Sequence, residues 1–180
     1  MTSNSSAIAL EAKAVSHSFG SQAVLDSINL KLRQGELTAL IGPNGAGKST
    51  LLHVLQGLLK PSQGDVFVGD TPVTSCRHRI ALMPQRGRID WSFPITALDM
   101  VRLRKPKTRT GSFVVSAEEA LERVGLRERA KERLGRLSGG QQQRVLLAGA
   151  IAQNAATMLL DEPCSALDPP SRERVIALLQ

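Results

Sequence analysis

Residues 37–50 read Leu-Thr-Ala-Leu-Ile-Gly-Pro-Asn-Gly-Ala-Gly-Lys-Ser-Thr, and the part from Gly42 onward satisfies the phosphate-loop pattern G-x-x-x-x-G-K-[ST]. The apolar run before the glycines predicts a buried parallel strand over Leu37–Ile41. The residues after them predict a helix over Lys48–Leu58. A strand, a glycine-rich turn and a helix form the context that this motif requires. The stretch therefore predicts an α/β fold with a mostly parallel central sheet.

The glycines of this loop let the backbone turn tightly and approach an anion, with successive N–H groups pointing at the phosphates. We expect Lys48 to reach the β- and γ-phosphates and Ser49 to offer its hydroxyl to Mg²⁺. The alternative is a glycine-rich turn that binds no ligand. The residues expected to contact ATP here are Gly42, Pro43, Asn44, Gly45, Ala46, Gly47, Lys48, Ser49 and Thr50.

A second apolar run, Thr157–Leu160, predicts another buried strand and ends in Asp161-Glu162. A carboxylate at Asp161 can hold Mg²⁺, which keeps several waters when it binds to proteins. Glu162 could polarise an attacking water as a general base. The alternative is a pair of acidic side chains that simply face solvent. The phosphate loop upstream favours the catalytic interpretation.

Between these two motifs lies Leu137-Ser-Gly-Gly-Gln141, followed by Gln142-Gln143-Arg144. A serine and two glycines at a helix start could form a second anion site. A plain serine N-cap explains the same residues. We expect the helix that starts at Ser138 to extend through Gln153.

Taken together, these motifs resemble the ATPase subunit of ABC transporters, and the resemblance covers nearly the whole chain. It implies a P-loop NTPase fold and a head-to-tail dimer with two ATP molecules at its interface. One chain's loop would face the partner's signature residues, which are Ser138, Gly139, Gly140 and Gln141. It further implies that Phe19 stacks on adenine, with a core residue as the alternative. Gln85 would sense Mg²⁺ and water, and Ser165–Asp168 would contact the partner subunit.

The resemblance also implies the domain organisation. Residues 1–180 would form one ABC ATPase domain, with 1–92 and 154–180 as its nucleotide-binding core and 93–153 as a helical subdomain. Alternation over Ile28–Arg33, together with Ile8–Val15, predicts an N-terminal antiparallel β layer. Further predicted elements are short strands at Val66–Val68 and Ile80–Met83, a Thr96-capped helix over Ala97–Leu103, a capping box at Ser116–Glu119, and a helix opening at Asp168-Pro169.

The basic composition admits another class of function. The net charge is +7, which suits an anionic partner such as nucleotide, nucleic acid or an acidic membrane face. An ABC ATPase acting on DNA or ribosomes is therefore an alternative. The sequence between the ATP motifs contains no heptad array, however, and aromatic residues are only 3% of the chain, so we expect no nucleic-acid partner. We expect the basic stretch Arg102–Thr110 to be a solvated loop, with acidic headgroups as the alternative contact.

The segment Met83–Thr96 points to a substrate class by resemblance alone. Its Asp90-Trp91 and Phe93-Pro94 look like the corresponding part of ABC importers for zinc, manganese or iron. The alternative is that Trp91 and Phe93 merely fill an apolar contact. The resemblance implies integral membrane permease subunits and a solute-binding protein as partners. Because no apolar run approaches a membrane span, we expect a peripheral position on the cytoplasmic face of the membrane.

The family's switch histidine is not among the residues of this sequence, since no histidine follows His78. The resemblance places it after the next strand, beyond Gln180, so the 180-residue sequence would stop before it. We therefore expect nucleotide binding to be more robust than hydrolysis in this form. An ATP-binding module without turnover is the corresponding alternative.

Overall fold

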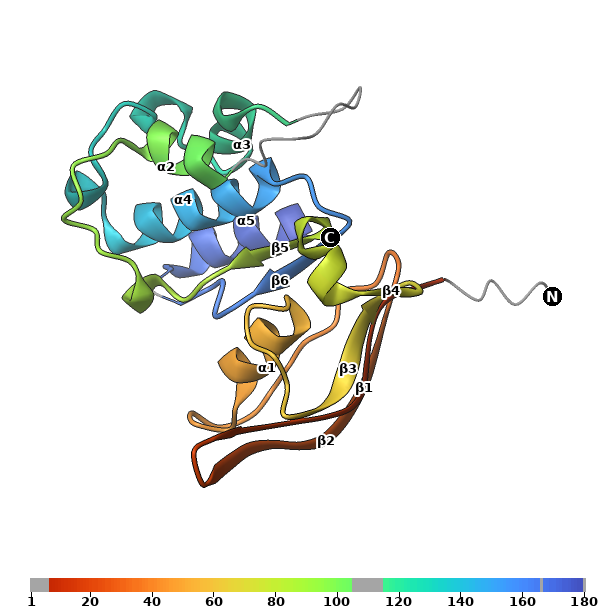
Figure 1. Ribbon diagram of the computed structural model, residues 1–180. Coiled ribbons are helices and arrows are strands. Elements are labelled where there is room, and N and C mark those ends of the chain that lie inside the picture. The colour runs from red at the N-terminus through yellow and green to blue at the C-terminus, as the bar shows by residue number, and fades with distance from the viewer. Residues whose placement is uncertain (1–6, 105–114, 166, 180) are drawn as a thin grey trace. The chain divides into compact units, whose positions relative to one another are not determined.

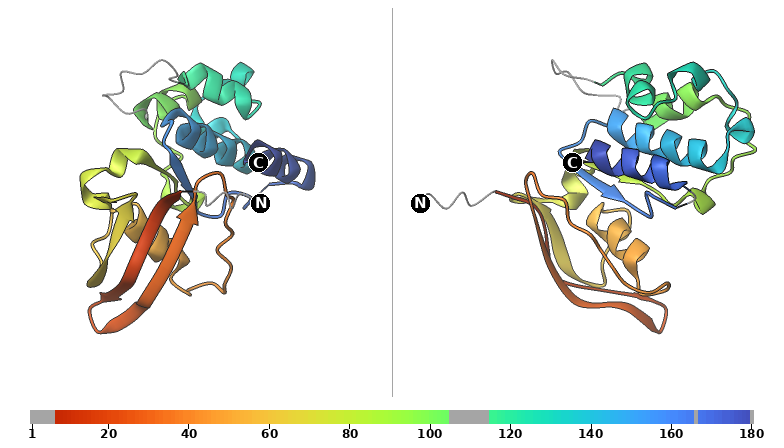
Figure 2. Two further views of the ribbon diagram at one scale, coloured as in Figure 1. Left: turned by 90° about the vertical axis from the view of Figure 1, so that its right-hand side faces the viewer. Right: turned by 180° about the vertical axis from the view of Figure 1, so that it is seen from behind.

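The computed structural model describes residues 7–104, 115–165 and 167–179 (Figure 1). The chain divides into two compact units, Met1–Ile80 and Ala81–Gln180. The first unit contains the N-terminal sheet and the phosphate loop. The second contains a helical cluster and a two-stranded sheet. Figure 2 gives further views of both.

The first unit is built on an antiparallel sheet of strand order β2-β1-β3-β4. The predicted antiparallel layer is confirmed, although its strands are longer than expected. In β2 the side chains of Ile28, Leu30 and Leu32 are half-buried and those between them are exposed, as the alternation predicts. The strands are β1 (Ile8–Phe19), β2 (Gln22–Arg33), β3 (Gln63–Val68) and β4 (Thr71–Pro72).

Helix α1 (Lys48–Leu55) belongs to the first unit and is shorter than the predicted Lys48–Leu58. Gly57 follows the helix with φ +76°, a conformation that glycine adopts without strain. The Gly57 N–H donates to the carbonyl of Val54 and the Leu58 N–H donates to that of His53, both at 2.9 Å. This pair of bonds is the Schellman motif, which satisfies the last helical carbonyls and ends the helix.

The predicted buried strand over Leu37–Ile41 is wrong. Residues 37–41 adopt no regular secondary structure, and Ile41 is 89% exposed. Apolar composition marks a segment that gains from burial, but a strand also needs a neighbouring backbone to accept and donate its hydrogen bonds. The described residues pair no strand with this run.

The second unit is organised around α4 (Gly139–Ala152), most of whose side chains are buried. The helices α2 (Ala97–Arg104) and α3 (Ala117–Arg123) lie on one side of it, and the pair β5 (Ile80–Met83) and β6 (Thr157–Leu160) lies on the other (Figure 1). The two strands form a parallel sheet. The last helix is α5 (Pro169–Leu179). Among the described residues, short 3-10 turns lie at Val73–Ser75, Arg77–Arg79, Arg86–Arg88, Arg127–Arg129 and Leu134–Arg136.

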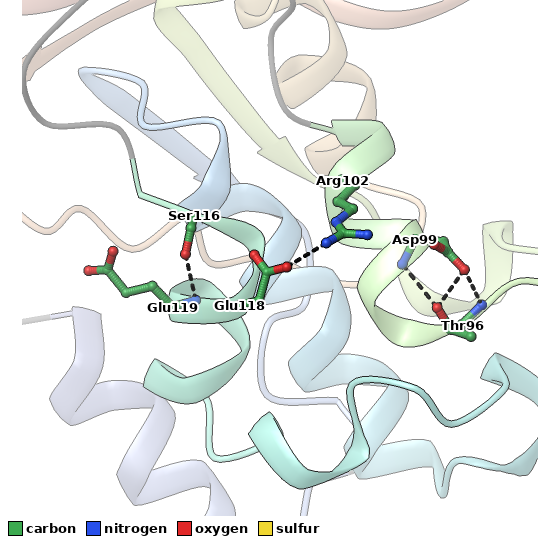
Figure 3. A network of polar contacts seen from close by, with 6 residues as sticks. All are labelled: Thr96, Asp99, Arg102, Ser116, Glu118 and Glu119. Atoms are coloured by element: carbon green, nitrogen blue, oxygen red, sulfur yellow. Dashed lines mark hydrogen bonds and ion pairs between the residues drawn. The ribbon is translucent and has the colours of Figure 1, made fainter.

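Side-chain caps fix the starts of these helices, as predicted. The hydroxyl of Thr96 accepts from the Asp99 N–H at 3.1 Å, and the Asp99 carboxylate accepts from the Thr96 N–H at 3.2 Å. Ser116 accepts from the Glu119 N–H at 2.9 Å. Arg102 of α2 pairs with Glu118 of α3 at 2.6 Å, so the two capped helices are also joined by an ion pair (Figure 3). None of the helices among the described residues has the length and apolar character needed to span a bilayer.

The predicted solvated loop over Arg102–Thr110 is wrong for its first residues, since α2 continues to Arg104. The guanidinium of Arg104 donates to the Leu82 carbonyl at 3.0 Å, and its side chain lies over Gly149 of α4. Burial lowers the pKa of this guanidinium from its ordinary value. A missing side chain at Gly149 provides the room, which no local pattern around Arg104 could predict. The rest of that stretch, from Lys105 to Thr110, lies outside the described residues.

Candidate functional site

The phosphate loop, residues 42–50, is held at its end by a glycine in a left-handed conformation. Gly47 is the N-cap of α1 with φ +82°. A Cβ there would lie 2.9 Å from the Val24 carbonyl oxygen of β2, so the loop also needs a glycine for space. Because α1 begins at Lys48, the N–H groups of Lys48, Ser49 and Thr50 fall in the first helical turn, where they have no intrahelical acceptor. This is the arrangement that the predicted anion site requires.

The Lys48 ammonium is turned back into the loop. It donates to the carbonyl oxygens of Gly42 at 2.9 Å and Pro43 at 2.7 Å. The cation is therefore held over the loop by weak neutral acceptors, which a phosphate oxygen could replace with a stronger charge-assisted bond. Ser49 stands in the first turn of α1 beside it.

A second group of polar side chains gathers where β5 and β6 end. We call Gln85, Gln143, Asp161 and Glu162 the strand-end site. Gln85 follows β5 and donates its amide to the Glu162 carboxylate at 3.1 Å, although the two residues are far apart in the sequence. Asp161 is 5% exposed, and its N–H donates to the Met83 carbonyl at 3.0 Å, which continues the pairing of the two strands. The structure thus brings the predicted catalytic residues Gln85 and Glu162 together.

Glu162 has an unusual main-chain conformation. Its φ is +51°, which L-residues other than glycine seldom adopt. Its carbonyl accepts two hydrogen bonds, from the Gln143 amide at 2.7 Å and from the Ser165 N–H at 3.1 Å. Backbone outliers of this kind gather at functional sites, where surrounding contacts maintain them.

Two adjacent glutamines of α4 were assigned no role from the sequence. Gln142 accepts from the Arg86 guanidinium at 2.7 Å and donates to the Leu134 carbonyl at 3.2 Å. Gln143 holds Glu162, as described above. Both are buried although they are polar, and beyond Arg144 the helix continues with the buried apolar residues Val145–Ala148. Two glutamines just before an apolar helical run could have indicated this role, because a polar group that is buried there needs a hydrogen-bond partner.

The signature residues form the predicted helix cap. The Gln141 N–H donates to the Ser138 hydroxyl at 3.3 Å, and the Ser138 N–H donates to the Gln141 side chain at 2.9 Å. This capping box leaves Gly139 and Gly140 in the first turn of α4. The N-cap interpretation of Ser138 is confirmed. It is compatible with anion binding, since the first-turn N–H groups of any helix lack intrahelical acceptors.

The aromatic candidates differ in exposure. Phe19 is 54% exposed, so the core alternative for it is wrong. Its ring meets His17 edge to face, with centroids 4.8 Å apart. Trp91 packs against the core of the second unit and donates to the Arg86 carbonyl at 3.0 Å, as the alternative interpretation predicts, whereas Phe93 is exposed.

The predicted partner-contact segment follows Glu162 directly. Leu167 is buried, and Asp168 begins α5 by accepting from the Ser171 N–H at 3.4 Å. The hydrogen bond from the Ser171 side chain is the main cause that lowers the pKa of Asp168, assisted by the Ser171 N–H and the charge of Arg144. Ala166 lies outside the described residues.

The oxygen donors suit magnesium. Mg²⁺ takes only one or two protein ligands and completes its shell with water and phosphate oxygens. Of the predicted ligands, Ser49 has a hydroxyl in the first turn of α1 in the first unit, and Asp161 has a carboxylate after β6 in the second unit. Among the described residues no group of three or more His, Cys, Asp or Glu side chains could hold a metal by itself. Each unit therefore supplies an oxygen donor of a kind that Mg²⁺ accepts.

A glycine-rich phosphate loop before a helix, a carboxylate pair at a strand end and a capped Gly-Gly helix start define a nucleotide-binding protein of the P-loop ATPase class. The family model for the ABC transporter matches residues 25–165. The chain therefore belongs to the ABC transporter family, whose P-loop NTPase fold and ATPase class it shares.

Curated relatives are ATP-binding subunits of transport systems. The manganese transport system ATP-binding protein MntB of Listeria monocytogenes is 38% identical over 95% of this chain and 74% of its own length. The zinc transport system ATP-binding protein TroB of Treponema pallidum is 36% identical over 98% of this chain and 69% of its own length. The share of the relatives' length that the chain spans falls to 63% in a metal transport system protein of Chlamydia pneumoniae.

Solved structures agree with this assignment. A dimeric ATP-binding cassette in a post-hydrolysis state, bound to ADP and Pi, superposes with a TM-score of 0.81 at 30% identity. The match covers 94% of this chain and 81% of that one.

Proposed function

We propose that this protein is the ATP-binding and ATP-hydrolysing subunit of an ABC transporter that imports a transition-metal ion. The observation that carries the hydrolytic part is the hydrogen bond between Gln85 and Glu162 at the ends of β5 and β6. It holds a candidate general base in one orientation. The ion class rests on the names of the relatives, which include manganese and zinc transport systems.

The phosphate loop would bind the triphosphate. Its main-chain N–H groups and Lys48 neutralise the phosphate charge, and the positive end of the α1 dipole adds to this attraction. Ser49 and Asp161 would hold Mg²⁺, which would neutralise charge on the phosphate oxygens when bound. The exposed ring of Phe19 offers a stacking surface for adenine.

Glu162 would accept a proton from the attacking water as general base, and the Gln85 amide would orient Glu162 and that water. Positioned general bases contribute roughly 10²–10⁴-fold to rate. Most of the remaining catalysis would come from positioning and charge stabilisation.

The partners follow from family membership. Two copies would associate head to tail, with Ser138–Gln141 of each copy completing the ATP site of the other and Ser165–Asp168 contacting the partner subunit. The dimeric relative of known structure supports this arrangement. Membrane permease subunits would hold the protein at the cytoplasmic face of the membrane, and a solute-binding protein would deliver the ion. No nucleic acid is expected.

Closure of the dimer on ATP would be transmitted to the permease through the segment that follows Gln85. In this proposal residues 1–92 and 154–180 form the nucleotide-binding core, and residues 93–153 form a helical subdomain. The caps fix the starts of α2 and α3, and the Arg102–Glu118 pair joins these two helices (Figure 3).

The test is ATP turnover by the purified protein assembled with its permease in liposomes. Glu162→Gln should reduce kcat by roughly 10²–10⁴-fold while nucleotide binding persists. Wild-type binding without turnover would favour a nucleotide-binding module and contradict the proposed ATPase. ATP-dependent uptake of ⁵⁴Mn or ⁶⁵Zn would support the proposed ion class. ATP turnover that is not stimulated by either metal and is not accompanied by uptake of either would reject it.

A further inference from the structure

Gln143 is buried without an obvious structural need for its amide. It is 1% exposed, and the α4 residues after Arg144, Val145 to Ala148, are all buried and apolar. Within the described part of the chain, its Oε1 atom has no hydrogen-bond partner. A buried acceptor without a partner lowers stability, so packing alone would favour an apolar side chain here. The amide is therefore expected to serve something other than stability.

The amide nitrogen of Gln143 donates to the carbonyl oxygen of Glu162 at 2.7 Å. The short distance marks a good hydrogen bond. The carbonyl also accepts from the Ser165 N–H at 3.1 Å, which closes the turn after β6. Gln143 is thus the contact from outside this turn that fixes the peptide plane at residue 162.

The orientation of that peptide plane decides where the carboxylate of Glu162 points. With φ at +51°, the side chain leaves the backbone in a direction that an extended residue would not give. In that direction the carboxylate meets the Gln85 amide at 3.1 Å. One amide therefore holds the main chain of Glu162 and another holds its side chain.

We infer that Gln143 is a positioning residue for ATP hydrolysis: it maintains the left-handed conformation of Glu162 and so aims the general base. The inference rests on the proposed function, in which Glu162 is that base. Gln143 contacts neither the nucleotide nor the water in this role.

The main experiment compares Gln143→Met with Gln153→Met. Methionine keeps the length and the apolar stem but cannot donate to the carbonyl. Gln153 is the matched control, because it is a glutamine at the other end of the same helix whose amide donates to the Gly149 carbonyl. Gln143→Met should lower kcat about 10–100-fold, as expected for a misplaced catalytic group, with KM for ATP changed less than about twofold. Gln153→Met should leave both parameters unchanged.

A structural role is separated from a positioning role by repeating the change in the Glu162→Gln background. If Gln143 acts through Glu162, Gln143→Met should not lower the residual rate further. An equal loss of kcat in both backgrounds, or loss of nucleotide binding together with kcat, would overturn the inference. So would an unchanged kcat in the single variant.

Hydrogen exchange tests the inference even if the wild-type protein hydrolyses no ATP, in which case the proposed function fails by itself. Gln143→Met should accelerate exchange of the Ser165 amide, because the turn around Glu162 would lose its external contact. Gln153→Met should not. Unchanged exchange at Ser165 would overturn the positioning role independently of activity.

Discussion

In the phosphate loop one continuous stretch, Gly42–Thr50, supplies all of the expected contacts, whereas the strand-end site takes its residues from three distant segments. The loop depends on two local properties, glycine conformations and the start of α1, and on the close approach of Gly47 to β2 within the same unit. The strand-end site depends on the pairing of β5 with β6 and on the burial of α4 beneath them. The difference implies that the loop should tolerate damage to the core of the second unit and that the strand-end site should not.

The largest expected effect comes from Leu146→Ala, which removes a fully buried side chain from α4. The cavity should lower the free energy of unfolding by about 2–5 kcal/mol. At temperatures where the variant is still folded, kcat should fall while nucleotide affinity changes little. Urea denaturation and ATPase assays check this. Ile176→Ala on α5, whose side chain is 41% exposed, is the matched control and should cost well under half as much. Equal loss of affinity and turnover would contradict the contrast between the sites.

Lys48→Ala attacks the loop instead. It removes the cation that now bonds to the Gly42 and Pro43 carbonyls and that we expect to bind phosphate. Loss of two charge-assisted hydrogen bonds should raise the Kd for ATP by about 100-fold, roughly 3 kcal/mol. Fluorescence titration with a nucleotide analogue measures this, with Lys31→Ala on β2 as the control, which should stay within twofold. A Kd that Lys48→Ala leaves unchanged would exclude the loop as the phosphate site.

Comparing substitutions at two glycines of the loop distinguishes backbone strain from steric conflict. Gly45 and Gly47 both have positive φ, near +83°, but a Cβ at Gly45 meets open space and one at Gly47 meets the Val24 carbonyl at 2.9 Å. Gly45→Ala should lower the free energy of unfolding by about 1 kcal/mol, because alanine is strained at this positive φ. Gly47→Ala should lower it by about 2–3 kcal/mol, because the close contact with the Val24 carbonyl adds to the same strain. Thermal unfolding of both variants provides the comparison. Equal destabilisation by the two substitutions would mean that β2 moves aside and that the contact with Val24 adds no energy.

The smallest effect is expected from acid at the start of α2. The pKa of Asp99 is held below its ordinary value, chiefly by the hydroxyl of Thr96 and also by its N–H. Because the pKa of Asp99 is lower in the folded state, its ionised carboxylate stabilises the fold. This stabilisation is complete above the ordinary aspartate pKa, about 3.9, and is lost as the pH falls through the folded value. The protection of the α2 amides, corrected for the intrinsic pH dependence of exchange, should therefore decrease below about pH 4 in the wild type. Asp99→Asn should show a weaker pH dependence there, and an equal dependence would mean that other groups control the helix start.

Much of the fold follows from local patterns. The alternation of β2 and the caps at Thr96, Ser116 and Ser138 were predictable because each depends on residues close together in the sequence. The end of α1 was misplaced by a few residues. Gly57 carried the signal, but a glycine inside an apolar pattern does not by itself end a helix.

The candidate site divides in the same way. Two apolar runs, Leu37–Ile41 and Thr157–Leu160, gave the same prediction, yet only the second became a strand, because only it has a paired neighbour among the described residues. Arg104 entered the core because Gly149 leaves space for it. The contact between Gln143 and Glu162 could not be derived, since it depends on how α4 lies against β6.

The sequence by itself determined the phosphate loop, the helix caps and family membership, because these depend on spacing and on main-chain preferences that act over a few residues. Tertiary structure alone decided which apolar run forms a strand, which polar side chains are buried, and which amide holds Glu162. The physical reason is that these outcomes require partners from distant segments. A single residue can offer a hydrogen bond or an apolar surface, but only packing selects the group that receives it.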